Sequence, residues 1–175
     1  HQGVKPGLLQ SENAADLVER AAKQLLLGEV RVALESIESA LEIDAKKGPA
    51  WLLKARLLAA GEGNTKAALK SIRRASALGE YTVMLESEIL ENDGRTDAAI
   101  QVLEEHLEKT PSDPEVRGKL SLLWLRNGSN DSSCRVLDEA PDESWDSAPL
   151  HIMRGRLHLV DADEHRDNTG KHEQM

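Results

Sequence analysis

Aromatic residues are scarce in this chain of 175 residues: phenylalanine is absent, and only three tryptophans and one tyrosine are present. A hydrophobic core must therefore be built from Leu, Ile, Val and Ala, which suits closely packed helices and suits a β-sandwich poorly. Cys134 is the single cysteine, so an intramolecular disulfide is excluded and the cysteine content indicates no compartment. No apolar run approaches the length of a membrane-spanning helix, and we expect no direct insertion of this chain into a membrane.

Basic residues are also in the minority. The chain has 22 Lys and Arg against 31 Asp and Glu, and its net charge is −9. Residues 138–175 hold ten acidic and four basic residues, a net charge of −6. An acidic surface without a basic stripe argues against nucleic acid as a partner. The hydrophobic fraction of 39% and the charged fraction of 30% are typical of a folded chain rather than a disordered one.

Three stretches of the sequence repeat one another, and each places small and aliphatic residues on one helical face. They are Ala33–Leu41, Ala67–Ala75 and Ala98–Leu107. The copies, with a fourth that is weaker, begin 35, 31 and 34 residues apart when aligned on Ala33, Ala68, Ala99 and Ser133. A period near 34 indicates stacked helix–turn–helix units, which form a solenoid rather than a globule around a closed pocket.

The pattern predicts four pairs of helices and a ninth helix. Their expected ranges are 13–27 and 30–43, 49–60 and 65–78, 81–92 and 96–109, 114–126 and 131–139, and finally 147–160. The turn within each pair contains glycine, which tolerates positive φ, at Gly28, Gly61 or Gly63, Gly94 and Gly128. We expect residues 1–12 to be an irregular lead-in, residues 13–160 to form the repeat domain and residues 161–175 to be a polar, frayed tail.

These features resemble the tetratricopeptide repeat (TPR) family over about residues 14–160. That family places a large residue near the start of helix A, a small residue four positions later, glycine at the turn, and alanines on helix B. The second repeat supplies Trp51, Ala55, Ala68, Ile72 and Ala75 in this order. The resemblance implies an all-α, right-handed α-solenoid of about four TPR-like helix–turn–helix repeats plus a terminal helix.

Small residues are expected at the contacts between helices A and B, where bulky side chains would push the helices apart. The alanines expected to be buried are Ala21, Ala33, Ala40, Ala55, Ala68, Ala75 and Ala99. The fourth repeat departs from the pattern because it has Ser121 and Ser133 at such positions. His106 stands where the repeat has alanine, which predicts looser or rearranged packing between the third and fourth repeats.

The inner, concave face of a TPR array is lined mostly by helix A, so the resemblance implies a scaffold that binds a partner protein or peptide segment there. The predicted groove residues are Val18, Leu52, Arg56, Tyr81, Met84, Glu88, Leu122, Arg126, Ile152 and Arg156. The same inner positions include Glu115, Gly118 and Pro149. We expect the three arginines to orient an acidic or carboxylate-bearing segment. In the alternative interpretation, some of the aliphatic residues belong to the core.

No arrangement of residues indicates catalysis. The sequence shows no acid–base pair, nucleophile constellation or ligand cluster, so we predict that the protein is not an enzyme and has no catalytic, cofactor-binding or metal-binding residues. Four histidines recur every seven residues from His151 to His172, but seven residues are about 10.5 Å of helix rise, too far for one metal ion. The alternatives to a scaffold are a homo-oligomerisation module or an accessory domain of a larger enzyme.

The cellular setting is open. The first residue is His1 rather than methionine, so we expect a fragment or a mature form without its targeting segment. The degenerate Leu- and Ala-rich repeats are similar in style to those of bacterial TPR proteins, including envelope proteins that assemble exopolysaccharide or pilus machinery. This similarity favours the bacterial periplasm or envelope, in an assembly or secretion system, with a cytoplasmic adaptor as the alternative.

Overall fold

The computed structural model describes residues 13–61 and 64–172, and side chains as far as Val160. The expected lead-in at residues 1–12 lies outside the described residues. Within them the chain is all-α, a helical-repeat solenoid without strands. Contacts divide it into two compact units, which we call unit 1 (His1–Thr82) and unit 2 (Val83–Met175).

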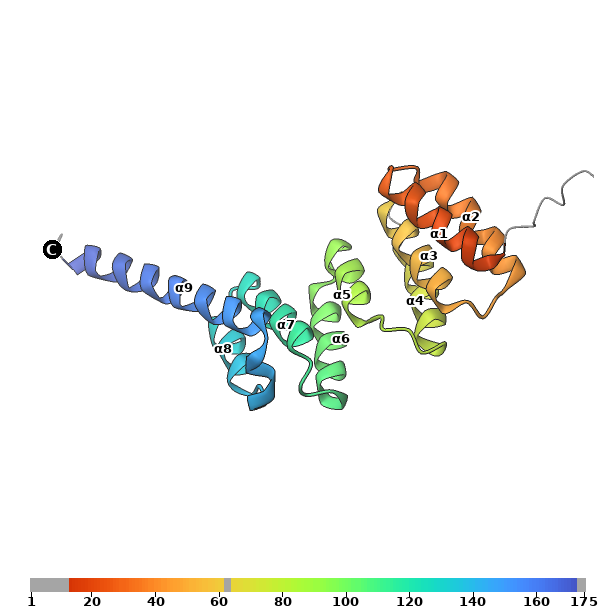
Figure 1. The fold of residues 1–175 in the computed structure, drawn as a ribbon. Helices are drawn as coiled ribbons and strands as arrows, with labels where there is room; N and C mark the ends of the chain where they lie inside the picture. Colours follow the sequence, from red (N-terminus) through yellow and green to blue (C-terminus); the bar gives the residue numbers. More distant parts are fainter. Residues whose placement is uncertain (1–12, 62–63, 173–175) are drawn as a thin grey trace, which may run out of the picture. The chain divides into compact units, whose positions relative to one another are not determined.

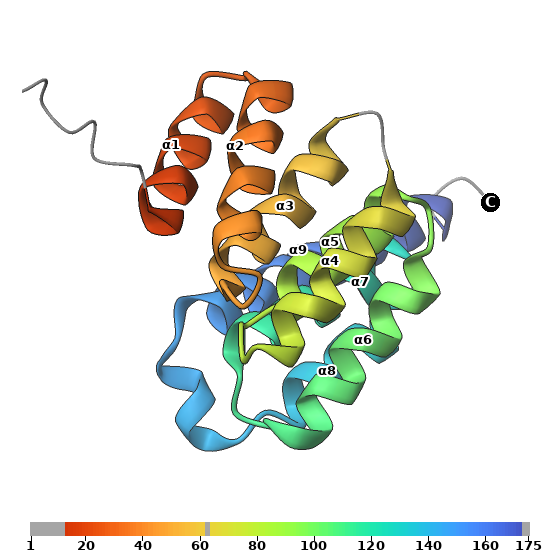
Figure 2. The ribbon, with the colours of Figure 1, turned by 90° about the vertical axis from the view of Figure 1, so that its right-hand side faces the viewer.

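Unit 1 consists of two helical hairpins. Helix α1 (Ala14–Leu26) pairs with α2 (Val30–Ile43), and α3 (Gly48–Ala60) pairs with α4 (Thr65–Ala77). Helix α3 also packs on α1 and α2, so these three helices lie side by side (Figures 1 and 2). Their shared core contains Ala21, Ala33, Ile37, Ala50 and Leu57. Helix α1 begins where the Asn13 side chain accepts hydrogen bonds from the backbone N–H groups of Ala15 and Asp16, which satisfies two otherwise unpaired donors.

Unit 2 contains two further hairpins and a long terminal helix. Helix α5 (Val83–Asn92) pairs with α6 (Thr96–Lys109), and α7 (Pro114–Arg126) pairs with α8 (Asn130–Asp138). A short 3-10 helix, η1 (Asp142–Asp146), leads into α9 (Ala148–His172), which packs on α7 and α8. Leu137, Leu150, Met153 and Leu157 form the core beneath α9.

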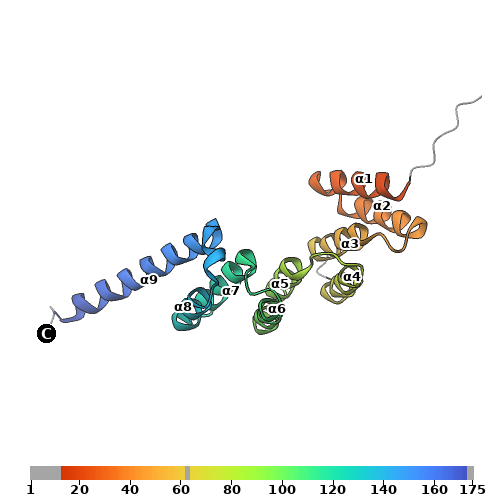
Figure 3. The ribbon, with the colours of Figure 1, turned by 60° about the horizontal axis from the view of Figure 1, so that its bottom comes forward.

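The predicted helices agree with the observed ones to within two residues at every boundary except the end of the last. Helix α9 continues to His172, beyond the predicted end at residue 160, while the division of the chain at residue 161 into repeat domain and frayed tail stays a prediction. No proline or glycine interrupts residues 161–169, and a helix that meets no such residue can continue. Figures 1 and 3 show α9 as one uninterrupted helix that extends beyond its contacts with α7 and α8. The 3-10 helix η1 was not expected.

The small residues lie where the repeat pattern places them. All seven alanines expected at the helix contacts are fully buried, with 0% of their surface exposed. The turn glycines agree at three places, because Gly28, Gly94 and Gly128 have φ values of 77°, 76° and 78°. Gly61 does not agree: its φ is −80°, and Gly63 lies outside the described residues. Gly79, which follows α4, has the other positive φ among the described glycines, 88°.

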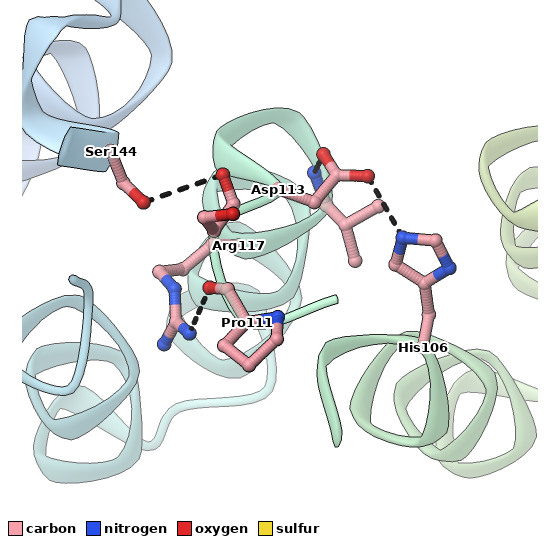
Figure 4. A network of polar contacts seen from close by, with 7 residues as sticks. His106, Pro111, Asp113, Arg117 and Ser144 are labelled. Carbon is pink, nitrogen blue, oxygen red and sulfur yellow. Dashed lines mark hydrogen bonds and ion pairs between the residues drawn. The ribbon is translucent and has the colours of Figure 1, made fainter. Parts of the chain in front are cut away.

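The connection between α6 and α7 is held by polar contacts around His106 (Figure 4). The Nε2 atom of His106 lies 2.8 Å from Oδ2 of Asp113, whose other carboxylate oxygen accepts a hydrogen bond from the backbone N–H of Val116 at the start of α7. Both side chains are mostly buried. His106 therefore links α6 to the N-terminal cap of α7, which agrees with locally rearranged packing at this position, the second of the two expectations.

Arg117 extends this network to the other side of α7. Its Nη2 donates a hydrogen bond of 2.7 Å to the carbonyl oxygen of Pro111, and its Nη1 donates one of 2.8 Å to that of Val136 in the last turn of α8. Ser144 of η1 donates a longer bond of 3.4 Å to the carbonyl of Ser112 (Figure 4). The last carbonyl groups of a helix have no partner within it. Arg117 thus caps α8 from a neighbouring helix.

Candidate partner-binding surface on helices α5, α7 and α9

An open pocket of about 310 Å³ lies in unit 2, lined by residues of α5, α7 and α9. These are three successive helices of the A type in the repeat pattern. The lining is mostly apolar, with charged groups among it. It consists of Met84, Glu115, Gly118, Lys119, Leu122, Pro149, Ile152, Met153 and Arg156.

The close approach of α7 and α9 forms one wall of this pocket. Gly118 is buried in the middle of α7, and a Cβ atom at this position would lie 3.2 Å from Cβ of Pro149. Such a distance is tighter than ordinary van der Waals contact, so the absence of a side chain lets the start of α9 lie against α7. The start of α7 is fixed by the Asp113 cap and by Pro114 at the first helical position. The cap at the start of α7 and the glycine within it therefore help to position this wall of the pocket.

One side of helix α9 faces the core, and another side faces the mouth of the pocket. Leu150, Met153 and Leu157 are buried against α7 and α8. Ile152 lines the pocket but keeps 55% of its surface exposed. Ile152 thus adds an exposed aliphatic side chain to the apolar lining of the pocket.

An ion-pair cluster stands beside the pocket. The Glu91 carboxylate of α5 accepts hydrogen bonds from Nζ of Lys119 and, at 2.7 Å, from Nη1 of Arg126, both on α7. Burial raises the pKa of Glu91, but the hydrogen bonds and positive charges of Lys119 and Arg126 outweigh that effect and hold the pKa below its ordinary value. Glu91 is therefore ionised at neutral pH and ties α5 to α7.

Four of the ten predicted groove residues lie around this one pocket: Met84, Leu122, Ile152 and Arg156. Leu122 also packs against the core cluster beneath α9. Arg156 is exposed and makes no ion pair with the side chains that the structure describes. Two further predicted residues of unit 2 do not line the pocket: Glu88 is exposed on α5, and Arg126 is occupied by Glu91.

The remaining predicted residues belong to unit 1. Val18 is half-buried and packs against two core clusters, which agrees with the alternative interpretation that some of these aliphatic residues are core. Leu52 is half-buried, and Arg56 and Tyr81 are exposed. The lining of the pocket described above consists of unit 2 residues alone.

Two lining residues, Lys119 and Met153, were not predicted. Lys119 follows an inner helix A position directly, and its ion pair with Glu91 spans 28 residues of sequence, so no local signal marked it. Met153 belongs to the core beneath α9 and also lines the pocket. The repeat pattern assigns each residue either to the core or to the groove, so it could not predict this double role.

The described side chains form no cluster suited to a metal ion: among them, no group of three or more His, Cys, Asp and Glu is placed to hold one. His151, the first of the regularly spaced histidines, contacts its own chain, since its Nε2 lies 2.6 Å from the carbonyl oxygen of Trp145. Within the described residues, no helix combines the length and apolar character that a membrane crossing requires.

No protein-family model and no curated protein sequence matches the chain. Solved structures do match it. TTC0263, a TPR protein of Thermus thermophilus, is 20% identical with a TM-score of 0.65, and the match covers 86% of this chain and 84% of that one. MamA residues 41 to the end, from Desulfovibrio magneticus RS-1, are 16% identical with a TM-score of 0.62, and the match covers 92% of both chains.

A third match is YrrB, described as a TPR protein with an unusual peptide-binding site. It is 18% identical with a TM-score of 0.57, and the match covers 87% of this chain and 80% of that one. Sequence identities of 16–20% show that the fold is shared, but they do not show which partner this chain binds. The chain has the tetratricopeptide-repeat fold.

Proposed function

We propose that the protein is an interaction scaffold whose helix A surface holds a segment of a partner protein. The observation that carries this proposal is the apolar pocket between α5, α7 and α9, with the exposed Ile152 at its mouth. Concave apolar sites with a few convergent polar groups are the usual binding sites of proteins. YrrB, which shares the fold, is described as having a peptide-binding site, and this supports the same class of ligand here.

The chemistry of the pocket suggests what the segment carries. A volume of about 310 Å³ accommodates one or two aliphatic side chains, which would contact Met84, Leu122 and Ile152. Arg156 stands at the same pocket, and a guanidinium group binds a carboxylate in a bidentate manner. We therefore propose an extended or helical segment with an aliphatic anchor and an acidic group close to it.

The other six predicted residues extend the proposal beyond this pocket. Val18, Leu52, Arg56 and Tyr81 would contribute from unit 1, and Glu88 and Arg126 from unit 2. Because Arg126 already pairs with Glu91, reversing its charge would disturb that ion-pair cluster as well as any partner contact. Arg156 is therefore the better arginine for a test.

A site-specific cross-linking experiment tests the proposal. A photoreactive amino acid replaces Ile152 in the full chain expressed in its native organism, and a matched variant carries it at Gln101, an exposed position on α6. We expect one discrete partner adduct from position 152 and none from 101. Arg156→Glu should reduce that adduct several-fold, whereas Arg135→Glu on α8 should not. Equal adducts at both positions would contradict the proposal.

The same experiment separates the alternatives. An adduct of twice the chain's mass, with peptides of this chain alone, would indicate a homo-oligomerisation module instead. We also propose that the protein does not bind nucleic acid and is not an enzyme. A place in the bacterial envelope is a further proposal. Sequencing the gene upstream of the codon for His1 tests the envelope setting, because an export signal or lipoprotein signal there would support it.

A further inference from the structure

A second pocket, of about 490 Å³, lies in unit 1, where the connection between α2 and α3 meets α3 and α4. The lining of this pocket is more basic than the lining of the pocket in unit 2. Three of its lining residues are cationic, Lys46, Lys70 and Arg74, and they surround Trp51, Ala77 and Leu78. It belongs to other helices than the pocket of the proposed scaffold function, and that function assigns it no role.

The three cations of this pocket are not neutralised by the residues that the structure describes. Some cations of unit 1 are paired within the chain, such as Lys23 with Glu19 and Lys54 with Glu38. By contrast, Lys46, Lys70 and Arg74 make no ion pair with a described side chain. Helix α4 carries four basic residues and no acidic one. Helix α4 is therefore locally basic in a chain whose net charge is −9.

An ordered aromatic ring and apolar side chains complete the pocket. The indole Nε1 of Trp51 donates a hydrogen bond of 2.9 Å to the carbonyl oxygen of Ala45, and Nζ of Lys54 lies 5.7 Å from the ring centroid. The ring is thus held on one side by the connection between α2 and α3 and on another by a cation. Leu78, at the end of α4, leaves 40% of its surface exposed. The pocket offers apolar contact and positive charge together.

We propose that this pocket binds a short acidic segment of a partner protein, with its carboxylates near Lys46, Lys70 and Arg74 and an aliphatic side chain against Trp51 and Leu78. Charge complementarity argues for an anionic occupant. A protein segment is favoured over nucleic acid because repeated phosphates require an extended basic track, and the chain's net charge of −9 repels a long polyanion. Apolar walls suit an aliphatic side chain and contribute nothing to a phosphate backbone.

The test uses the full chain and a defined probe, the acetylated and amidated peptide Glu-Glu-Leu-Glu-Glu-Leu-Glu-Glu. Binding is followed by the indole N–H resonance of Trp51, which the variant Trp51→Phe identifies by its loss. The double variant Lys70→Glu/Arg74→Glu reverses two pocket charges. The matched control Lys66→Glu/Arg73→Glu makes the same charge change on the same helix, at positions outside the pocket lining.

We expect the peptide to shift the Trp51 resonance, and its Kd to rise by about tenfold or more in the pocket variant but to change little in the control. A peptide with Gln in place of every Glu should not bind. Three results would overturn the proposal: no shift of the Trp51 resonance at millimolar peptide, equal loss of binding in both variants, or tighter binding of oligothymidylate than of the peptide at this pocket. Concentration-dependent self-association that only the pocket variant abolishes would identify a second copy as the occupant and overturn it too.

Discussion

The hydroxyl oxygens of Ser121 on α7 and Ser133 on α8 lie 2.8 Å apart, and both side chains are fully buried. The Ser133 hydroxyl also lies 2.8 Å from the backbone carbonyl oxygen of Ser121, and the Ser121 hydroxyl 3.2 Å from that of Ser133. These positions correspond to small residues at the A–B contact of the other repeats. The fourth repeat therefore keeps the close contact and adds polar bonds across it.

We predict that the two serines are strongly coupled. Each single variant, Ser121→Ala or Ser133→Ala, leaves one buried hydroxyl without its side-chain partner and should lower the free energy of unfolding by about 0.5–1.5 kcal/mol. The double variant removes both hydroxyl groups while keeping the volume small, so its cost should be well below the sum of the two. Urea unfolding followed by the fluorescence of Trp124 and Trp145, both in unit 2, measures all three. Additive losses would contradict the coupling.

A second prediction concerns Arg117, whose side chain caps α8 and holds the turn before α7. Burial lowers the pKa of this guanidinium, and the negative charge of Glu139 partly offsets the effect. Arg117→Lys keeps the charge but cannot donate to both carbonyl groups in the same geometry. We expect it to lower the free energy of unfolding of unit 2 by about 2–4 kcal/mol. The exposed Arg135→Lys is the matched control, and an equal effect of the two variants would exclude the capping role.

The helices were predictable from the sequence because their signals are local. Buried alanines repeat at helical spacing, glycines mark three of the turns, and the sequence Asp113-Pro114 marks the start of α7. The end of α9 was not predictable in this way. Beyond residue 160 the sequence has no apolar period and no proline, and its first glycine is Gly170. The loss of the apolar pattern near residue 160 therefore predicted an end that the backbone does not have.

The candidate site was predictable only in part, since its geometry depends on contacts between distant residues. The repeat register identified Met84, Leu122, Ile152 and Arg156, which the structure places around one pocket. The register also places Glu91 on the inner face, but it gives no sign that Glu91 pairs with Arg126, which is 35 residues away. An arginine expected to receive a ligand is instead engaged within the protein, and only the three-dimensional arrangement reveals this.

A third prediction tests the repeat register through its alanines. Ala40 and Ala75 are fully buried, and leucine at either position would overpack the contact between helices. We expect Ala40→Leu and Ala75→Leu to lower the free energy of unfolding by roughly 1–3 kcal/mol. Ala77→Leu, at an exposed position of the same helix as Ala75, should have little effect. Thermal or urea unfolding of the three variants distinguishes these outcomes, and parental stability of the first two would mean that the register is wrong.

The last prediction concerns pH and the ion-pair cluster of Glu91. Its pKa in the folded protein is lower than the ordinary value of 4.5 because Lys119 and Arg126 together outweigh the effect of burial. A carboxyl group whose pKa is depressed by folding stabilises the protein above the unfolded-state pKa, and this stabilisation is lost as the pH falls through the folded-state pKa. The parent should therefore be more stable than Glu91→Gln at pH 7, and the difference should shrink below about pH 4.5.

Urea unfolding of the parent and the Glu91→Gln variant between pH 3 and pH 7 measures this difference. Glu88→Gln, an exposed substitution on the same helix, is the control and should show little dependence on pH relative to the parent. A carbon-detected NMR titration of the Glu91 carboxyl group gives its pKa directly. If the stability difference between parent and Glu91→Gln is constant across this pH range, the ionised carboxylate is not what ties α5 to α7.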